Sequence, residues 1–430
     1  MRIHTIIIIG INMWNRITSN SQVLIVAMIV GIGFMGIALP YPIFAPMLLG
    51  QSDPILLPTT VSHSTRMVML GMLLAVYQVG EFLGAPMLGA LSDIQGRKKT
   101  LIITLTGTTI GYGISALAIL THSFWLLVIS RLFTGFCEGN IAIAQASVAD
   151  MSDSVDKVKG FSWINTAAAL GYTLGPLLGG LLASGVLWRY FGYSLPFFMA
   201  MLFALIALLC VIYFFQETVI STDNPPIPIL SNIITHFISG IKSIPQAFQQ
   251  TPVRRALLIF LFLFIGIDLF YEFYPLYFVA KWQFSALDIA WFTAVYCVPY
   301  MFSQIIIVLW VSKKFNPTQI LIGAGIMCAI ILIIMVIPNS YKSLYITLAL
   351  LGIAYSFCST NVGVLLSNAV SSNEQGKILG VAQSLRMLNS GLFALIGGFV
   401  AVMMASLPLI LASLAILVSV GMVLRKTWRK

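Results

Sequence analysis

Apolar runs of about twenty residues recur along the whole sequence, and they constrain the fold more than any other feature. A helix of about twenty residues crosses the hydrocarbon core of a bilayer, which is roughly 30 Å thick. Every backbone N–H and C=O group in that core must be hydrogen-bonded inside the protein, and a helix satisfies its own groups. The sequence therefore predicts an all-α integral membrane protein.

The composition supports this interpretation. Of the 430 residues, 59% are apolar and only 8% are charged, too few to cover the surface of a soluble protein of this size. The net charge of +10 comes from short turns between apolar runs, so it does not indicate a nucleic-acid partner. We find no metal-ligand spacing, phosphate loop or nucleophile–base set, and we therefore expect no metal, no cofactor and no enzymatic activity.

The apolar runs predict twelve spans. A cytoplasmic segment over 1–21 comes first, a six-helix bundle is expected over 22–214 and a second over 254–424, with a cytoplasmic linker over 215–253 and a cytoplasmic tail over 425–430. The predicted spans are 22–49, 66–91, 100–120, 124–148, 160–184, 192–214, 254–280, 288–311, 318–337, 343–369, 378–401 and 405–424.

The loop charges predict the orientation. Lys and Arg residues outside the membrane interior number seventeen on the side of the N-terminus and four on the other side. Positive charge is enriched in cytoplasmic loops, so both termini are expected in the cytoplasm.

The two halves resemble each other at three points, in the same order along the chain. The pentapeptide FCEGN at 136–140 recurs as FCSTN at 357–361, LSDIQGRKKTL at 91–101 aligns with VSKKFNPTQIL at 311–321, and the glycine pair at 179–180 aligns with that at 397–398. The offsets barely change, which favours two related six-span halves.

The stretch LGALSDIQGRKKTL at 88–101 gathers four charges in seven residues of a nearly uncharged chain. Gly96 can adopt a positive φ and reverse the chain between two helices. Asp93 can pair with cations or cap a helix, and Arg97 with Lys98 and Lys99 can anchor at lipid headgroups. A simple cytoplasmic anchor would need only the positive charges.

This stretch resembles the signature between helices two and three of the major facilitator superfamily of secondary transporters. The matching positions are Gly89, Asp93, Gly96, Arg97 and Lys98. RLFTGFCEGN, which begins at Arg131, resembles the fourth-helix motif of this family, and GYTLGPLLGG at 171–180 resembles the fifth-helix motif of its antiporters. The resemblance implies two bundles around a central cavity, alternating access, a drug–proton antiporter-like branch, and a gate at the charged turn.

The residues of the fifth-helix segment also predict a close helix–helix contact without reference to the family. Gly171, Gly175 and Gly179 form a smooth stripe that lets another helix approach, and Pro176 removes a backbone donor; Gly180 extends the motif. Flexure at a gating contact and ordinary membrane packing are both consistent with this pattern, and we favour flexure.

Six ionisable residues fall inside predicted spans, where an uncompensated charge costs on the order of 3 kcal/mol. Asp268 and Glu272 are one helical turn apart in an aromatic-rich span, so both cannot ionise cheaply and one is expected to carry a proton. The nearby rings would also suit an organic cation. The alternative is that Glu272 lies in a hydrated outer mouth. These six candidates are Glu81, Arg131, Glu138, Asp268, Glu272 and Arg386.

The other four candidates leave alternatives open. Glu81 either belongs to the coupling machinery or is paired structurally. Arg131 and Glu138 share a helix face but lie about 10 Å apart along the axis, which disfavours a direct pair. Arg131 could hold a carboxylate ionised or form a static ion pair. Arg386 could be the counterpart of Arg131 in the second half or could bind an anionic substrate.

Three functions are compatible with these features. The first is proton-coupled export of small amphipathic or cationic compounds, which we favour. The second is proton-coupled import of a metabolite or siderophore-like solute. The third is a membrane sensor or scaffold that no longer transports. We expect a monomer in a bacterial inner membrane, with the lipid bilayer, protons and a small-molecule substrate as its partners.

Overall fold

The computed structural model describes residues 21–50, 56–58, 60–151, 157–184, 192–218, 244–337, 340–370 and 375–427. Twelve helices in this part of the chain are long and apolar enough to cross a membrane, in agreement with the number predicted. The candidate spans are Ser21–Leu49, His63–Gln95, Arg97–Leu120, Phe124–Val148, Trp163–Ala183, Gly192–Phe214, Thr251–Trp282, Ala286–Val311, Pro317–Val336, Ser343–Ser367, Ile378–Met403 and Leu407–Arg425.

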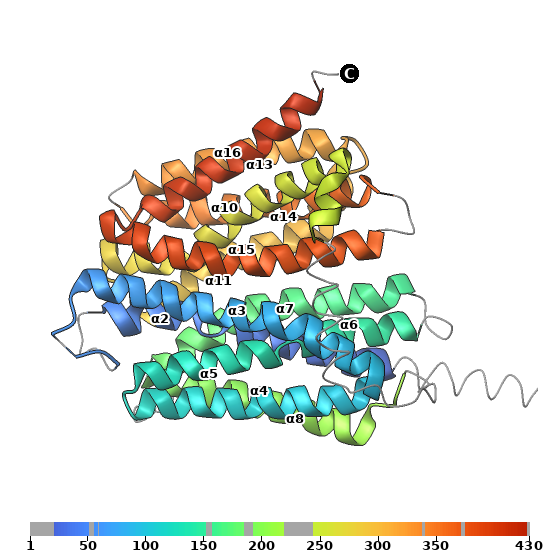
Figure 1. Cartoon of the computed structure of the whole chain (residues 1–430). Helices are drawn as coiled ribbons and strands as arrows, with labels where there is room; N and C mark the ends of the chain where they lie inside the picture. Colours follow the sequence, from blue (N-terminus) through green and yellow to red (C-terminus); the bar gives the residue numbers. More distant parts are fainter. Residues whose placement is uncertain are drawn as a thin grey trace, which may run out of the picture.

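These spans correspond to the helices drawn in Figure 1, some of which extend a few residues beyond them. In the first half they are a helix over 21–38, α2 (Tyr41–Leu49), α3 (His63–Gln95), α4 (Arg97–Leu120), α5 (Phe124–Cys137), α6 (Asn140–Asp150), α7 (Lys157–Ala183) and α8 (Leu195–Phe214). In the second half they are α10 (Thr251–Trp282), α11 (Ala286–Phe302), α12 (Val308–Val311), α13 (Pro317–Val336), α14 (Ser343–Ser367), α15 (Gln375–Met403) and α16 (Leu407–Thr427).

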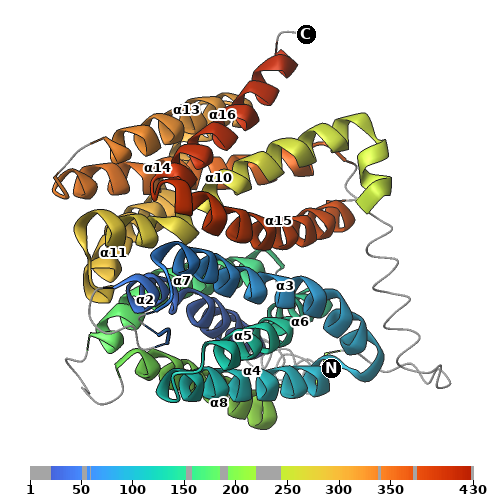
Figure 2. The same cartoon turned by 60° about the vertical axis from the view of Figure 1, so that its left-hand side comes forward.

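The helices form two stacked bundles. The first six spans, blue to green, make up the lower bundle in Figure 1, and the last six, yellow to red, make up the upper one; the rotated view in Figure 2 shows the same division. We call these bundles the N-half and the C-half. Most of the predicted linker, residues 219–243, and residues 1–20 lie outside the described residues.

The charged turn is shorter than predicted. The second span was expected to end at residue 91 and the third to begin at 100, but α3 continues to Gln95 and α4 begins at Arg97. Gly96 alone separates them, with φ at +96°, so its positive φ is confirmed. Polar residues extend these helices because the last turns of α3 and the first of α4 have their own hydrogen-bond partners and need no apolar environment.

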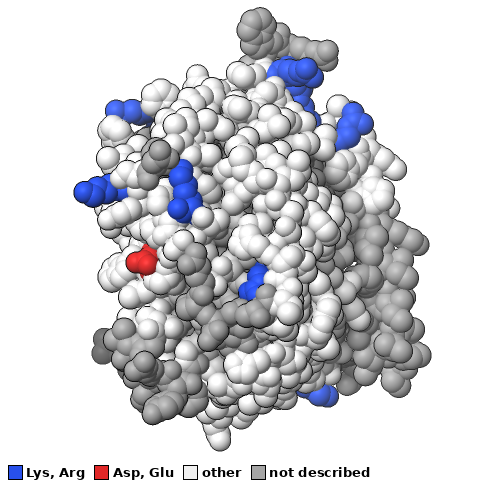
Figure 3. Space-filling model, turned by 90° about the vertical axis from the view of Figure 1, so that its left-hand side faces the viewer, with Lys and Arg blue, Asp and Glu red and all other residues white. Residues whose placement is uncertain are grey.

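The two halves touch closely at one end of the molecule. Near the start of α3, Gly71 lies against the backbone of Gly398 in α15, and near the end of α7, Gly180 lies against Ala286, where α11 begins. We call this the His63 end and the opposite one the Gly96 end. Among the described residues on this face, scattered Lys and Arg side chains and one small acidic spot lie on a mostly uncharged surface (Figure 3).

Glycines on the same helices near the Gly96 end have no such neighbours. A Cβ built on Gly89 of α3 or on Gly380 of α15 would meet no atom within 4 Å. The halves are therefore packed together at the His63 end and show no equivalent glycine contact between α3 and α15 at the Gly96 end, within the residues described.

Candidate functional site

Two acids of α10 face two polar residues of α15 where the halves meet. The Arg386 Nη2 atom lies 3.4 Å from Asp268 Oδ1, and the Ser390 hydroxyl donates to Glu272 Oε1 over 2.8 Å. Each helix contributes residues four apart, one helical turn, so the two pairs stack along the contact. Asp268 and Glu272 are 8% and 4% exposed.

Each of these carboxylates keeps one oxygen without a partner. Asp268 Oδ2 and Glu272 Oε2 are buried and accept no hydrogen bond from the described residues. A buried charge that lacks partners is costly, and protonation removes that cost. The pair is therefore suited to binding a proton, while Arg386 can compensate only one negative charge at a time.

Arg386 is the exposed member of the cluster. Its side chain is 31% exposed, and its guanidinium carbon lies 4.0 Å from the centre of the Phe264 ring. Glu81 of α3, in the N-half, is half-buried and lies close enough for Arg386 to act on it electrostatically. Arg386 is thus paired with a carboxylate of its own half and lies near one of the other half, although Glu81 makes no ion pair with it at salt-bridge distance.

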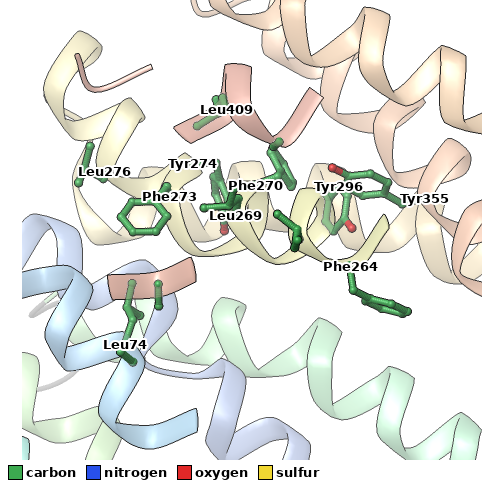
Figure 4. Close-up of a cluster of buried hydrophobic side chains, with 14 of the residues drawn as sticks. Leu74, Phe264, Leu269, Phe270, Phe273, Tyr274, Leu276, Tyr296, Tyr355 and Leu409 are labelled. Atoms are coloured by element: carbon green, nitrogen blue, oxygen red, sulfur yellow. The ribbon is translucent and has the colours of Figure 1, made fainter. Parts of the chain in front are cut away.

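Aromatic rings from both halves surround these acids. The Tyr271 ring of α10 lies 4.8 Å from that of Tyr41 and 6.4 Å from that of Tyr172, and Tyr172 packs against Phe34 at 4.8 Å. The rings continue into the C-half through Phe270, Tyr274, Tyr296 and Tyr355, which cluster along α10 in Figure 4. The Tyr271 hydroxyl is buried without a partner. Such a cluster suits a flat or cationic organic ligand.

The N-half buries its own arginine differently. The Arg131 guanidinium carbon lies 4.0 Å from the centre of the Tyr77 ring and 5.5 Å from that of Phe44. Its Nε and Nη1 atoms have no hydrogen-bond partner, and it makes no ion pair with any described residue. The static ion pair considered for Arg131 is therefore absent from this part of the chain. Glu138 instead accepts a hydrogen bond from the Tyr112 hydroxyl.

The charged turn forms a network within the N-half. Arg97 binds Asp93 one turn earlier in α3 and donates from Nε to Asp150 Oδ2 over 2.8 Å at the end of α6. Arg97 is 8% exposed, so our expectation that it anchors at lipid headgroups is wrong: its carboxylate partners hold it inside the protein. Lys98 is half-buried and Lys99 exposed.

Glu217 completes this network from beyond α8. Its Oε1 and Oε2 atoms accept the backbone N–H groups of Arg97 and Lys98, which begin α4. A Cβ at Gly96 would collide with the Glu217 carboxylate, so the glycine is needed both for its φ and for this contact. No described residue of the C-half pairs with the network.

The glycines of the fifth-helix motif allow α7 to pack closely against two different helices. Side chains at Gly171, Gly175 and Gly179 would collide with the backbone of the first span, at Gly31, Met35 and Leu39. Gly180 faces α11 of the C-half instead. Helix α7 continues through Pro176. The motif therefore lies where a helix of the N-half meets one of the C-half.

The sequence alone did not identify Ser390, Tyr172, Asp150 or Glu217 as site residues. Ser390 had a usable signal, because it follows Arg386 by four residues, the spacing of Asp268 and Glu272. The others depend on contacts between helices far apart in the chain.

A hollow on the C-half lies away from these acids. It has a volume of about 450 Å³ and is lined by apolar side chains of the C-half, among them Val311, Phe315, Met327 and Phe357. The ionisable candidates do not line it, so we do not assign the substrate to it.

The sequence profile of the Major Facilitator Superfamily matches residues 23–394 and 256–429, that is, nearly the whole chain. The chain belongs to the major facilitator superfamily. It is a transporter of this family and not an enzyme.

Relatives and solved structures of this superfamily resemble the chain over different lengths. Tetracycline resistance protein class C of Escherichia coli is 25% identical over 379 residues, which cover 86% of this chain and 87% of that protein. The class B protein of Escherichia coli is 30% identical over 205 residues, and there the alignment spans 47% of that protein. The D-xylose–proton symporter has a TM-score of 0.70 at 16% identity, covering 93% of this chain and 97% of that one, and shows the shared fold.

Proposed function

We propose that the chain is a proton-coupled exporter of small amphipathic or cationic compounds. The observation that carries this proposal is the Asp268–Arg386 pair, which lies between the halves beside Glu81 and a cluster of tyrosines. Three acids and one arginine leave the site with an excess of negative charge when the acids are ionised, and this favours a cation or a proton.

The coupling follows from competition for Arg386. When Asp268 takes up a proton, its attraction for Arg386 is lost, and the arginine can turn to Glu81 of the N-half. When Asp268 is ionised, it holds Arg386 within the C-half. A proton or a cationic substrate at this site therefore changes which half binds the arginine, which gives alternating access an electrostatic cause.

The relatives support export. Two of them are named tetracycline resistance proteins, and a membrane transporter confers resistance most directly by lowering the internal concentration of the compound. We extend the inference to compounds of similar size and do not restrict it to tetracycline.

We also propose that the Gly96 end faces the cytoplasm of a bacterial inner membrane, with both termini on that side. This orientation places the seventeen loop cations inside. The bundles then correspond to residues 22–214 and 254–424, with a cytoplasmic linker over 215–253. The arrangement described here, packed at the His63 end, is accordingly one that faces inward, and the turn at Asp93 and Arg97 would contact the C-half only when the inside closes.

The proposal is tested in inside-out vesicles with an acid interior and a trapped pH-reporting dye. Lipophilic cations are added outside first, then organic anions and neutral metabolites. We expect cations to release protons from the vesicles, and Asp268→Asn and Glu81→Gln to abolish this release. Asp288→Asn, which alters an exposed carboxylate that caps α11 and lies outside both the acid cluster and the charged turn, is the matched control and should retain it.

Proton release that persists in both Asp268→Asn and Glu81→Gln would contradict the proposed coupling. The absence of release with every compound would favour uptake, which right-side-out vesicles measure directly.

A second function is favoured by Arg131. Its buried guanidinium has two nitrogen atoms without partners, and these could bind an anionic group. Proton-coupled import of an anionic metabolite is therefore the alternative. Uptake that is driven by an inward proton gradient and lost in Arg131→Gln would establish it in place of export.

A further inference from the structure

The fourth span is interrupted deep inside the N-half. Helix α5 ends at Cys137 and α6 begins at Asn140, so Glu138 and Gly139 form a turn between them. The Ile141 N–H bonds to the Glu138 carbonyl, three residues earlier, which tightens the chain here. The interruption places two polar side chains, Glu138 and Asn140, in the interior of a membrane protein, and both are only 1% exposed.

These side chains line a small cavity. Its volume is about 10 Å³, roughly what a single water molecule needs, and its walls come from the first span, α4, the α5–α6 turn and α8. Thr108 and Tyr112 of α4 also line it. It is separate from the Asp268–Arg386 cluster, because every residue lining it belongs to the N-half.

Two acceptor oxygens at this cavity have no donor. Glu138 Oε2 and Asn140 Oδ1 are both buried without a hydrogen-bond partner. The other polar atom of each side chain is hydrogen-bonded. Glu138 Oε1 accepts from the Tyr112 hydroxyl at 3.2 Å, and Asn140 Nδ2 donates to Thr108 Oγ1 at 3.4 Å. A proton between these two buried acceptors would give each of them a hydrogen-bond partner.

We propose that Glu138 holds a proton on Oε2, which hydrogen-bonds to Asn140 Oδ1 directly or through one water in the cavity. The O–H bond forms with a proton from the aqueous phase, and the side chain changes from charge −1 to neutral. This gives the transporter a second proton-binding site, inside the N-half and apart from the site between the halves. Its link to transport rests on the proposed proton coupling, but its existence does not.

An ionised Glu138 would have no paired cation among the described residues. The cation of the N-half interior, Arg131, is seven residues away and makes no ion pair with Glu138, while Glu81 adds a second negative charge nearby. The first span and α8 contribute only apolar residues and Gly33 to the cavity wall. The titratable groups that act on Glu138 are Tyr77 and Glu81 of α3, Tyr112 of α4, and Arg131 and Cys137 of α5.

A sodium ion fits this cavity less well. A hard cation is bound by a shell of several oxygen atoms, whereas only two acceptor oxygens at this cavity, Glu138 Oε2 and Asn140 Oδ1, are unpartnered in the described residues. The first span also leaves little room: a Cβ at Gly33 would lie 3.4 Å from Glu138 Oε2 and 3.0 Å from Ile141.

Infrared difference spectroscopy of the purified full-length protein in lipid nanodiscs tests the proposal without any substrate. The spectrum of Glu138→Gln is subtracted from that of the unmodified chain at neutral pH. We expect the difference to contain the C=O stretch of a protonated carboxyl group. Tyr112→Phe removes a hydrogen bond to this group and should shift that band, and Glu217→Gln should leave it in place.

Carboxylate bands in the difference spectrum would overturn the proposal and would mean that Glu138 is ionised, with the Asn140 amide turned to donate to it. Conversion of the carboxyl band to carboxylate by sodium, but not by choline, would also overturn it in favour of a sodium site. If Glu138→Gln fails to fold, the shift in Tyr112→Phe decides alone. In vesicles we expect Glu138→Gln to reduce proton-driven flux severalfold while substrate exchange continues. If the flux of Glu138→Gln is unchanged although the infrared difference spectrum shows the protonated carboxyl group, Glu138 binds a proton but does not take part in coupling.

Discussion

Each half of the transporter packs an arginine against an aromatic ring, yet only one of these two arginines forms an ion pair with an acid. Arg386 of the C-half lies 4.0 Å from the centre of the Phe264 ring and 3.4 Å from an Asp268 oxygen. Arg131 of the N-half lies equally far from the centre of the Tyr77 ring and makes no ion pair with a described residue. The faces of the rings stabilise both cations, but only the first has a compensating anion.

The presence or absence of a paired acid suits the two arginines to different roles. Arg386 is partly exposed, so water can reach its pair with Asp268, and the proposed coupling requires this pair to open when a proton binds. Arg131 is 4% exposed and enclosed within one half. An ion pair at a moving interface can act as a switch, whereas an enclosed cation mainly sets the local potential.

The largest effect should come from breaking the paired arginine. Arg386→Gln leaves Asp268 buried without its cation, and we expect a loss of about 2 kcal/mol of stability, less than the roughly 3–5 kcal/mol of a fully enclosed pair because Arg386 is partly exposed. Thermal unfolding in detergent measures it. Asp268→Asn/Arg386→Gln should recover most of the stability but not the transport; a double variant as unstable as the single one would contradict the pairing argument.

The next largest effect is expected at Gly96, which directly precedes Arg97, the other arginine that is paired with acids. Gly96→Ala forces a side chain into a backbone with φ at +96° and against Glu217, so we expect a cost of about 1–2 kcal/mol. Gly89→Ala is the matched control, because its Cβ would meet nothing within 4 Å. Equal melting temperatures for the two variants would show that the turn tolerates a side chain.

A smaller effect is expected for Arg97 itself. Arg97→Gln removes the partner of Asp93 and Asp150, whose side chains are 59% and 28% exposed, so water can solvate them in its absence. We expect a loss of about 1 kcal/mol or less. The same thermal measurement at low and high salt checks it, and a loss as large as that of Arg386→Gln would erase the distinction between the two environments.

The smallest effect should be that of the unpaired arginine. Arg131→Met removes a buried cation with two unpartnered nitrogens, and the gain in desolvation offsets the lost ring contacts, so stability should change by no more than about 1 kcal/mol. Arg386→Met provides the comparison under identical conditions. A large destabilisation of Arg131→Met would reveal an anion that pairs with it.

The sequence alone predicted the membrane location, the number of spans, the family and the positive φ at Gly96. These features depend on hydrophobic length and on residue types at fixed local spacing, which are read directly along the chain. It also placed Asp268 and Glu272 on one helix face. Their functional roles, like those of the other ionisable candidates, remain predictions.

Only the tertiary structure decided which side chains meet. Asp268 reaches Arg386 and Glu272 reaches Ser390 across 118 residues of chain, and Glu138 reaches Tyr112 across a helix–helix contact. In a soluble protein, the apolar stripe of a helix shows which face is buried. Lipid is as apolar as the interior of a helix bundle, so these spans are apolar on all sides, and the periodicity of the sequence does not predict which face of each helix points inward. The pairing of the buried charges, and with it the contrast between the two arginines, follows from how the helices rotate and cross.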